Sequence, residues 1–213
     1  SGVRAMACMK HVGLNVASDP LYTVSYMGVN GGLLFMVADD PGLYSSQNEQ
    51  DTRMIARAAK VPVLEPSDSE EAKEFVKIGF ELSEQYDRPV IFRITTRLAH
   101  SQGLVELKER IEIPDKPYEK NIRKNVMMPG NAKYRHVEIE KRNRELKAAA
   151  ETLAINRVEL RDLKIGVITS GIPYQYVREA LPEASVLKLG MVHPLPEQTI
   201  RDFASRVETL YIV

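Results

Sequence analysis

The sequence contains no tryptophan, and Cys8 is its only cysteine among 213 residues. A single thiol can form neither a disulfide framework nor an iron–sulfur site, which needs about four thiolates. The 29 basic and 29 acidic residues cancel, so no overall field attracts nucleic acid. No apolar run approaches the roughly 20 residues that cross a bilayer, and the first residues lack the pattern of a signal peptide. We therefore expect a cytoplasmic protein with no nucleic-acid or membrane partner.

Common catalytic signatures are also missing. The chain has no Gly-x-Ser-x-Gly nucleophile motif, no Gly-rich phosphate loop after a strand, and no His or Cys residues at metal-binding spacing. The glycines at 28–32 precede a predicted strand, which is the wrong side for a dinucleotide fingerprint. Cys8 is expected to be a core residue. These absences leave an α/β protein whose site must be found from the positions of polar residues.

The stretch 33–51 organises the rest of the chain. Five apolar residues at 33–37 predict a strand that is buried on both faces. Asp39 and Asp40, followed by Pro-Gly, force a loop. Ser46 and Glu49 fit a capping box, which predicts a helix that starts there and continues to Ala59. The polar loop should therefore lie at the carboxyl end of a strand, where ligands bind in open α/β sheets.

Strands and helices are predicted to alternate along most of the chain. The expected strands lie near 4–9, 33–37, 61–64, 90–94, 164–169, 185–189 and 209–213. A helix should follow Asp19, another should open at the capping box of Ser67 and Glu70, and two more should reach Leu181 and Arg206. This alternation predicts an α/β fold with a parallel sheet that helices cover on both faces.

Between the two alternating parts the pattern changes. Prolines and charges at 103–135 indicate a connector, and 136–163 has the composition of a solvated, amphipathic helix. Its apolar face would carry Ile139, Leu146, Ala150 and Leu153. Alternation resumes at 164, with a loop expected at 191–196. Both ends of the chain fall in predicted strands, so we expect further residues on both sides.

Three polar clusters follow three of the predicted strands, at 10–15, 39–51 and 93–100. If these strands are parallel, the three clusters emerge at one edge of the sheet and form a common site. Lys10 and His11 could bind a phosphate or a carboxylate, although a histidine at a strand end often bonds nearby backbone. Asp39 and Asp40 could be metal ligands, or their carboxylates could hold the turn together.

The other two clusters leave similar alternatives. The residues Ser45, Ser46, Gln47 and Asn48 offer neutral donors and acceptors for an anion or a polar ring, but capping of the helix explains part of that pattern. Arg93 and Arg97 could clamp an anion, or one of them could pair with a neighbouring acid. Composition and spacing thus predict a polar site at a sheet edge without naming its chemistry.

Several longer motifs resemble one known family. They are Lys10-His11-Val12-Gly13-Leu14-Asn15 within 9–20, Asp39-Asp40-Pro41-Gly42 within 37–42, Ser45-Ser46-Gln47-Asn48-Glu49-Gln50-Asp51, Leu64-Glu65-Pro66-Ser67-Asp68, and Arg93-Ile94-Thr95-Thr96-Arg97. In this order they resemble the alpha (large) subunit of indolepyruvate ferredoxin oxidoreductase, a thiamine-diphosphate-dependent 2-oxoacid:ferredoxin oxidoreductase. The resemblance extends over the whole chain and is weakest at 103–163.

The resemblance implies an enzyme that oxidatively decarboxylates aryl 2-oxoacids such as indolepyruvate, forms an acyl-coenzyme A, and passes electrons to ferredoxin. Its cofactors would be thiamine diphosphate with Mg²⁺ and [4Fe-4S] clusters, the clusters lying outside these 213 residues. Its partner would be the beta subunit of the same enzyme. The alternatives are a related enzyme for pyruvate or branched-chain 2-oxoacids, or a non-catalytic interaction module of the same fold.

By the same resemblance, 1–102 would be part of a pyrimidine-binding domain, 103–163 a linker, and 164–213 the start of a transketolase-C-terminal-like domain. The glutamate that activates the cofactor would precede Ser1, so no catalytic residue and no metal ligand is expected here, and the chain alone should be inactive. The residues expected to line the cofactor cleft or a subunit interface are Lys10, His11, Asn15, Ser46, Gln47, Asn48 and Arg97.

Overall fold

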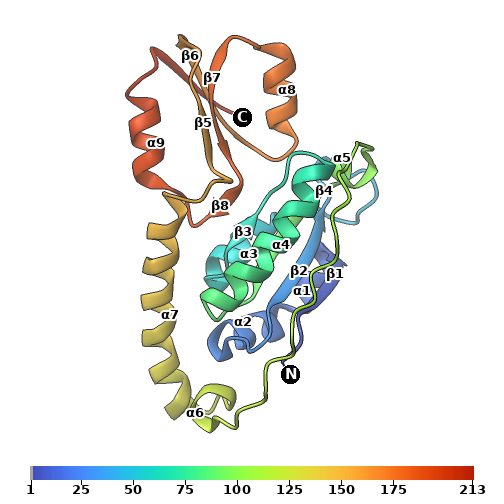
Figure 1. Ribbon diagram of the computed structural model, residues 1–213, viewed down its shortest axis with the longest axis vertical. Helices are drawn as coiled ribbons and strands as arrows, with labels where there is room; N and C mark the ends of the chain where they lie inside the picture. The colour runs from blue at the N-terminus through green and yellow to red at the C-terminus, as the bar shows by residue number, and fades with distance from the viewer. Residues whose placement is uncertain (1) are drawn as a thin grey trace.

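The computed structural model describes residues 2–213, which form two α/β units around two sheets (Figure 1). The first sheet has the order β1 (Ala5–Lys10), β2 (Leu33–Asp39), β4 (Val90–Thr95), β3 (Val63–Leu64) and β8 (Met191–His193). The first four strands are parallel, and β8 is antiparallel to β3. The carboxyl ends of β1, β2 and β4 therefore meet at one edge, as the alternating pattern predicts.

Helices cover both faces of this sheet. The helices α1 (His11–Val16), α2 (Ser18–Met27) and α3 (Thr52–Ala59) pack on one face through a core that includes Leu14, Leu21, Val37 and Ile91. The long helix α4 (Ser69–Gln85) packs on the other face through Phe75 and Leu82. The short helix α5 (Thr96–His100) follows β4. Burial on both faces explains the continuous apolar runs in the central strands.

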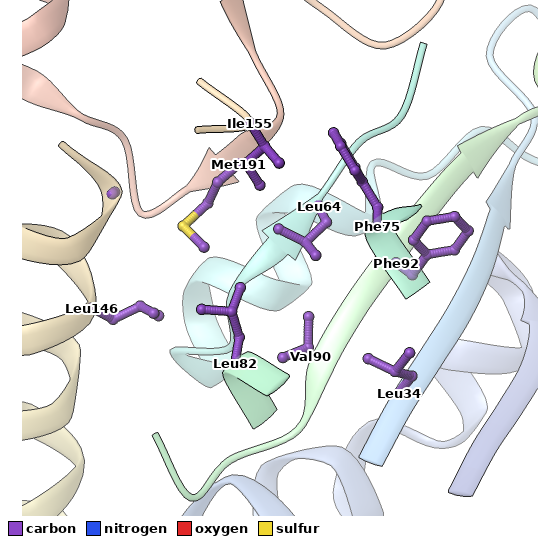
Figure 2. Packing of buried hydrophobic residues seen from close by; sticks show 10 residues of the cluster. Leu34, Leu64, Phe75, Leu82, Val90, Phe92, Leu146, Ile155 and Met191 are labelled. Carbon is purple, nitrogen blue, oxygen red and sulfur yellow. The ribbon is translucent and has the colours of Figure 1, made fainter. Parts of the chain in front are cut away.

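The predicted amphipathic helix is present, with most of its side chains exposed and one apolar face buried. After an extended stretch at 101–121 and the short α6 (Ile122–Asn125), α7 spans Pro129–Ala150. Ile139, Leu146 and Ala150 are fully buried, and Figure 2 shows Leu146, Ile155 and Met191 pointing toward Leu64 and Leu82. The predicted apolar face was correct, but it packs into the first core, and residues beyond 150 leave the helix.

The second sheet has the order β5 (Arg157–Glu159), β7 (Ala184–Leu189), β6 (Asp162–Ser170) and β9 (Thr209–Ile212). The strands β6, β7 and β9 are parallel, and β5 is antiparallel to β7. The helices α8 (Pro173–Ala180) and α9 (Glu197–Ala204) cover its two faces. The fold is thus α/β with mostly parallel, mixed sheets flanked by helices. No helix within 2–213 is long and apolar enough to span a membrane.

Three local predictions were wrong. The helix expected from Ser46 begins at Thr52, with Asp51 as its N-cap, because the Ser46 hydroxyl bonds Asp40 instead of a helix terminus. Cys8 is exposed, because β1 is the outer strand of its sheet. The loop expected at 191–196 includes strand β8, which ties the second part of the chain to the first sheet. A cap for α4 does form, but Asp68 supplies it.

Candidate functional site

The loop between β2 and α3 is held by the carboxylate of Asp40. It accepts hydrogen bonds from the Ser46 hydroxyl at 2.7 Å, the Ser45 amide at 2.8 Å and the Thr96 hydroxyl at 2.7 Å. These donors keep the pKa of Asp40 well below its usual value. Of the two alternatives for Asp40, the turn-holding role is the one this geometry supports. Among residues 2–213, no group of three or more His, Cys, Asp or Glu side chains could hold a metal ion.

A buried ionic network lies beneath this loop. The Nε atom of Arg93 is 2.6 Å from Oδ2 of Asp39, and its Nη1 atom is 2.5 Å from Oε1 of Glu65. All three side chains are nearly inaccessible to solvent. Asp39 also accepts hydrogen bonds from the backbone and hydroxyl of Thr52, at the start of α3. Arg93 therefore pairs with neighbouring acids, and its charge is used inside the protein.

Lys10 and His11 attach the end of β1 to the same loop. The Lys10 ammonium donates to the Ser45 carbonyl at 3.0 Å, and His11 Nε2 lies 3.1 Å from the Asn48 carbonyl. A bond to a carbonyl requires that Nε2 carries a proton and donates it. His11 is fully buried, and its Nδ1 has no partner among the described residues. Backbone bonding by His11 is therefore observed, but one polar atom stays unsatisfied.

The other sequence-derived candidates lie at different distances from this cluster. Asn15 is exposed one turn further along α1, and Gln47 is exposed on the loop. The Asn48 side chain accepts a hydrogen bond from Gln50 at 2.8 Å. Arg97 lies on α5, next to Thr96, which bonds Asp40. Lys10, His11, Ser46 and Asn48 are thus brought together, Arg97 lies on the other side of Asp40, and the roles of all seven residues stay predictions.

A cavity of about 430 Å³ opens between the carboxyl edge of the first sheet and α8 of the second unit. Residues from both units line it, among them Tyr44, Arg53, Glu65, Arg97, Ser170 and Tyr176. The Arg97 guanidinium carbon lies 5.8 Å from the centre of the Tyr176 ring. The phenol groups of Tyr176 and Tyr44 raise the pKa of Arg97, which stays a cation. The site therefore exists only when the two units are docked.

Three polar contacts dock the second unit at this edge. The Ser170 hydroxyl donates to Glu65 Oε2 at 2.8 Å, and Gln175 donates to Asp68 at 3.1 Å. The ammonium of Lys188, which is completely buried, bonds Glu71. Burial lowers the pKa of Lys188, and the carboxylate of Glu71 opposes that shift. These bonds fix the position of α8, and therefore of Tyr176, relative to Arg97.

Sequence reasoning missed Glu65 and Ser170. Glu65 directly follows β3, and Ser170 is the last residue of β6, so both stand at the carboxyl ends of strands. The rule that found the clusters after β1, β2 and β4 applies to them equally. Tyr44 and Tyr176 carried no comparable signal, because an aromatic residue in a loop or helix is more often a packing residue.

Comparisons with known proteins give a consistent result. No family model matches the chain. The chain is 42% identical to "Indolepyruvate oxidoreductase subunit IorA" of Archaeoglobus fulgidus over 223 residues, 44% identical to that of Pyrococcus horikoshii over 225, and 44% identical to that of Methanothermobacter marburgensis over 220. Each match covers all of this chain but only 35%, 35% and 36% of the relative. The chain therefore spans about a third of the length of these curated relatives.

A solved structure has the same fold. It is a 2-oxoglutarate:ferredoxin oxidoreductase from Magnetococcus marinus with 2-oxoglutarate, coenzyme A and succinyl-CoA bound. The TM-score is 0.73 at 18% sequence identity, and the match covers 97% of this chain and 45% of that chain. At this identity the likeness concerns the arrangement of helices and strands.

Proposed function

We propose that this chain, which belongs to the same family as the indolepyruvate oxidoreductase IorA subunits, forms part of a 2-oxoacid oxidoreductase. The observation that carries the proposal is the similarity to those subunits over every residue of the chain. The geometry agrees with it, since the segments after β2 and β4 line a cavity at one sheet edge, and Lys10 and His11 after β1 bond the first of these segments. The parent protein is an enzyme, and this chain supplies one wall of its site.

The finer proposal concerns the reaction. The enzyme would decarboxylate indolepyruvate or another aryl 2-oxoacid, transfer the acyl group to coenzyme A and reduce ferredoxin, with a beta subunit as its partner. The segments 1–102 and 164–213 would be parts of a pyrimidine-binding domain and a transketolase-C-terminal-like domain, joined by 103–163. We expect the enzyme in the cytoplasm. A related enzyme for pyruvate or branched-chain acids is the alternative that the activity assay distinguishes.

The donor set at the loop fits the aminopyrimidine part of thiamine diphosphate. His11 Nδ1 is a buried polar atom without a partner among the described residues, and the adjoining loop carries the exposed amides of Gln47 and Asn48. Lys10, Ser46 and Arg97 complete the set of residues that would hold or flank the cofactor. When bound, thiamine diphosphate would supply the carbon nucleophile and the electron sink that 2-oxoacid decarboxylation requires. The activating glutamate and the [4Fe-4S] clusters would come from outside these residues.

What this chain itself would do is bind and position. Asp40 fixes the loop that carries Ser46 and Asn48, because four donors converge on its carboxylate. The Arg93 network fixes the ends of β2, β3 and β4 relative to one another. A rigid support of this kind is what a cofactor cleft needs in order to hold reacting groups in place.

The experiment is a turnover assay of the complete complex. We expect reduction of ferredoxin that depends on indolepyruvate, coenzyme A and thiamine diphosphate together. His11→Gln should weaken retention of thiamine diphosphate, measured by its oxidation to a fluorescent product after denaturation. His136→Gln removes an exposed histidine of α7 and serves as the control. A loaded complex that reduces ferredoxin with no 2-oxoacid at all would contradict the proposal.

A further inference from the structure

The arginines at the floor of the cavity are already paired with carboxylates of the protein. Arg93 is bonded to Asp39 and Glu65, and the Arg53 guanidinium makes a two-pronged pair with Asp51 at 2.9 Å for both outer contacts. The Arg53 Nε atom is also 3.9 Å from Glu65. Each of these arginines therefore already has a carboxylate, and a ligand would have to displace it.

The rim of the cavity is different. Arg97 is exposed, and within residues 2–213 no carboxylate lies within 4.0 Å of its guanidinium nitrogens. Its neighbours are two tyrosines: the guanidinium carbon lies 5.8 Å from the centre of the Tyr176 ring, and the guanidinium donates hydrogen bonds to the phenol oxygens of Tyr44 and Tyr176. Tyr44 is 65% exposed and Tyr176 is 48% exposed, although both are large and partly apolar. One cation that has no carboxylate partner among the described residues thus stands between two accessible tyrosines.

The walls next to this rim are apolar. Pro41, Pro66, Ile172 and Pro173 line the cavity between the floor and the two tyrosines. A volume of about 430 Å³ lies within the range of pockets that bind small molecules, which is roughly 300–1,000 Å³. A guanidinium can stack on an aromatic ring and bind an anion with its edge at the same time. The rim therefore complements a planar ring that carries a negative group.

We propose that Tyr44, Arg97 and Tyr176 form a subsite for an aromatic ring bearing an anionic group. The proposal rests on the proposed function for the identity of its two candidate sources. One source is the aryl 2-oxoacid, whose ring would stack at the rim while its carboxylate pairs with Arg97. The other is the adenine nucleotide of coenzyme A, with the ring and a phosphate in the same places. Both present the shared chemistry of a ring next to an anion.

Tyr44 and Tyr176 come from different units, so the subsite requires that the two units are docked. Tyr44 is on the loop that Asp40 holds, whereas Tyr176 is on α8, which Ser170 and Gln175 dock against Glu65 and Asp68. The subsite is therefore assembled by the docking of the second unit on the first. A ligand that fills it would favour the docked arrangement, because it binds groups from both sides.

The test uses the complete complex with Tyr44→Leu, Tyr176→Leu and Arg97→Gln. The measured quantities are kcat/KM for indolepyruvate and for pyruvate, and KM for coenzyme A. Loss of one stacking or cation–π partner should change the affected quantity about tenfold. Tyr176→Phe keeps the ring and removes only the phenol oxygen that accepts a hydrogen bond from Arg97, so it should change each quantity less than Tyr176→Leu does. Tyr134→Leu removes an exposed tyrosine on α7, outside the cavity, and is the matched control.

The outcomes separate the two sources. A loss confined to indolepyruvate assigns the subsite to the ring of the 2-oxoacid. A higher KM for coenzyme A with both acids assigns it to the adenine nucleotide. Changes below about twofold in every quantity, with all three variants folded, overturn the proposal.

If the wild-type complex turns over neither acid, the proposed function fails, but the subsite is still tested. Equilibrium binding of indole-3-acetate and of adenosine monophosphate is then compared with binding of acetate and phosphate, which lack the ring. Tighter binding of a ring-bearing probe that Tyr176→Leu abolishes supports the subsite. Equal binding of all probes by both proteins overturns it.

Discussion

The two edges of the first sheet both gather basic side chains around carboxylates, but the two clusters differ in what they leave free. At the amino edge, Asp87 bonds Lys124 at 2.7 Å and Arg142 at 2.8 Å, and Arg135 lies 3.5 Å away and bonds the Tyr26 carbonyl. At the carboxyl edge, Arg93 is equally engaged, but Arg97 faces a cavity and contacts the phenols of Tyr44 and Tyr176 instead of a carboxylate of residues 2–213.

This difference shows that a cluster of charges does not by itself mark a binding site. The cations around Asp87 all serve to attach α6 and α7 to the first unit, since each bonds a carboxylate or a carbonyl of that unit. The carboxyl edge has the same kind of buried support and adds Arg97, an exposed cation that pairs with tyrosines and with no carboxylate of the described residues. The comparison between a saturated edge and an open edge yields five predictions.

The largest effect should come from Arg93→Met at the carboxyl edge. It leaves the buried carboxylates of Asp39 and Glu65 without their shared cation, which costs about 3–5 kcal/mol in the free energy of unfolding. Urea denaturation measures the loss. Arg110→Met on the exposed stretch before α6 is the control and should change stability by about 0.5 kcal/mol or less. A loss below about 1 kcal/mol for Arg93→Met would show that this edge is not supported by its ionic network.

Lys188→Met tests whether docking of the second unit depends on a buried charge pair. Glu71 keeps its bonds from Ser67 and its ion pair with Arg157 at 3.2 Å but loses the buried cation of Lys188, and we expect a loss of about 2–3 kcal/mol. The double variant Glu71→Gln/Lys188→Met removes both charges and should recover part of that loss, as a double-mutant cycle measures. Additive losses in the cycle would contradict direct coupling between the two side chains.

Asp87→Asn tests the saturated amino edge. Asparagine tolerates the positive φ of 49° at this position and can still accept the Val29 amide, so only the charge is removed. The three cations around it then repel one another, and we expect a loss of about 1–2 kcal/mol in thermal or urea unfolding. A loss as large as that of Arg93→Met would show that the ionic clusters at the two edges contribute equally to the free energy of unfolding.

The dependence of the free energy of unfolding on pH in the acid range tests Glu84 at the amino edge. The hydrogen bond from Arg4 is the main cause that lowers the pKa of Glu84 to about 2. Because the folded pKa is depressed, the stabilisation is present above the unfolded pKa of about 4 and is lost as the pH falls toward the folded value. Glu84→Gln should flatten the fall in stability below about pH 4 by about 1 kcal/mol. An unchanged pH dependence in this range would contradict the pairing with Arg4.

The smallest effect should be that of Cys8→Ser on the outer strand β1. The side chain is exposed, so the free energy of unfolding should change by about 0.5 kcal/mol or less. The thiol should also react with a disulfide reagent in the folded protein at the rate of an exposed cysteine. If the thiol reacts slowly and Cys8→Ser lowers the free energy of unfolding by more than about 1.5 kcal/mol, Cys8 is a core residue, as the sequence analysis expected.

The architecture could be predicted from the sequence because hydrophobic periodicity depends only on which residues are buried. The apolar runs at β2 and β4 and the stripe of α4 mark surfaces that must face other surfaces, whatever their partners are. Prediction from the sequence failed at Ser46 and Cys8 because those positions depend on a neighbour in space. Asp40 captures the Ser46 hydroxyl, and no further strand covers the outer side of β1.

By itself the sequence determined the α/β alternation, the parallel order that brings the ends of β1, β2 and β4 together, and the family. Only the tertiary structure decided which arginine pairs with buried carboxylates and which one faces the cavity, because Arg93 and Arg97 are four residues apart and chemically identical. Pairing depends on the distance to Asp39 and Glu65, which lie 54 and 28 residues away along the chain. It also decided that Tyr176 faces Arg97, since that contact arises only when the second unit docks on the first.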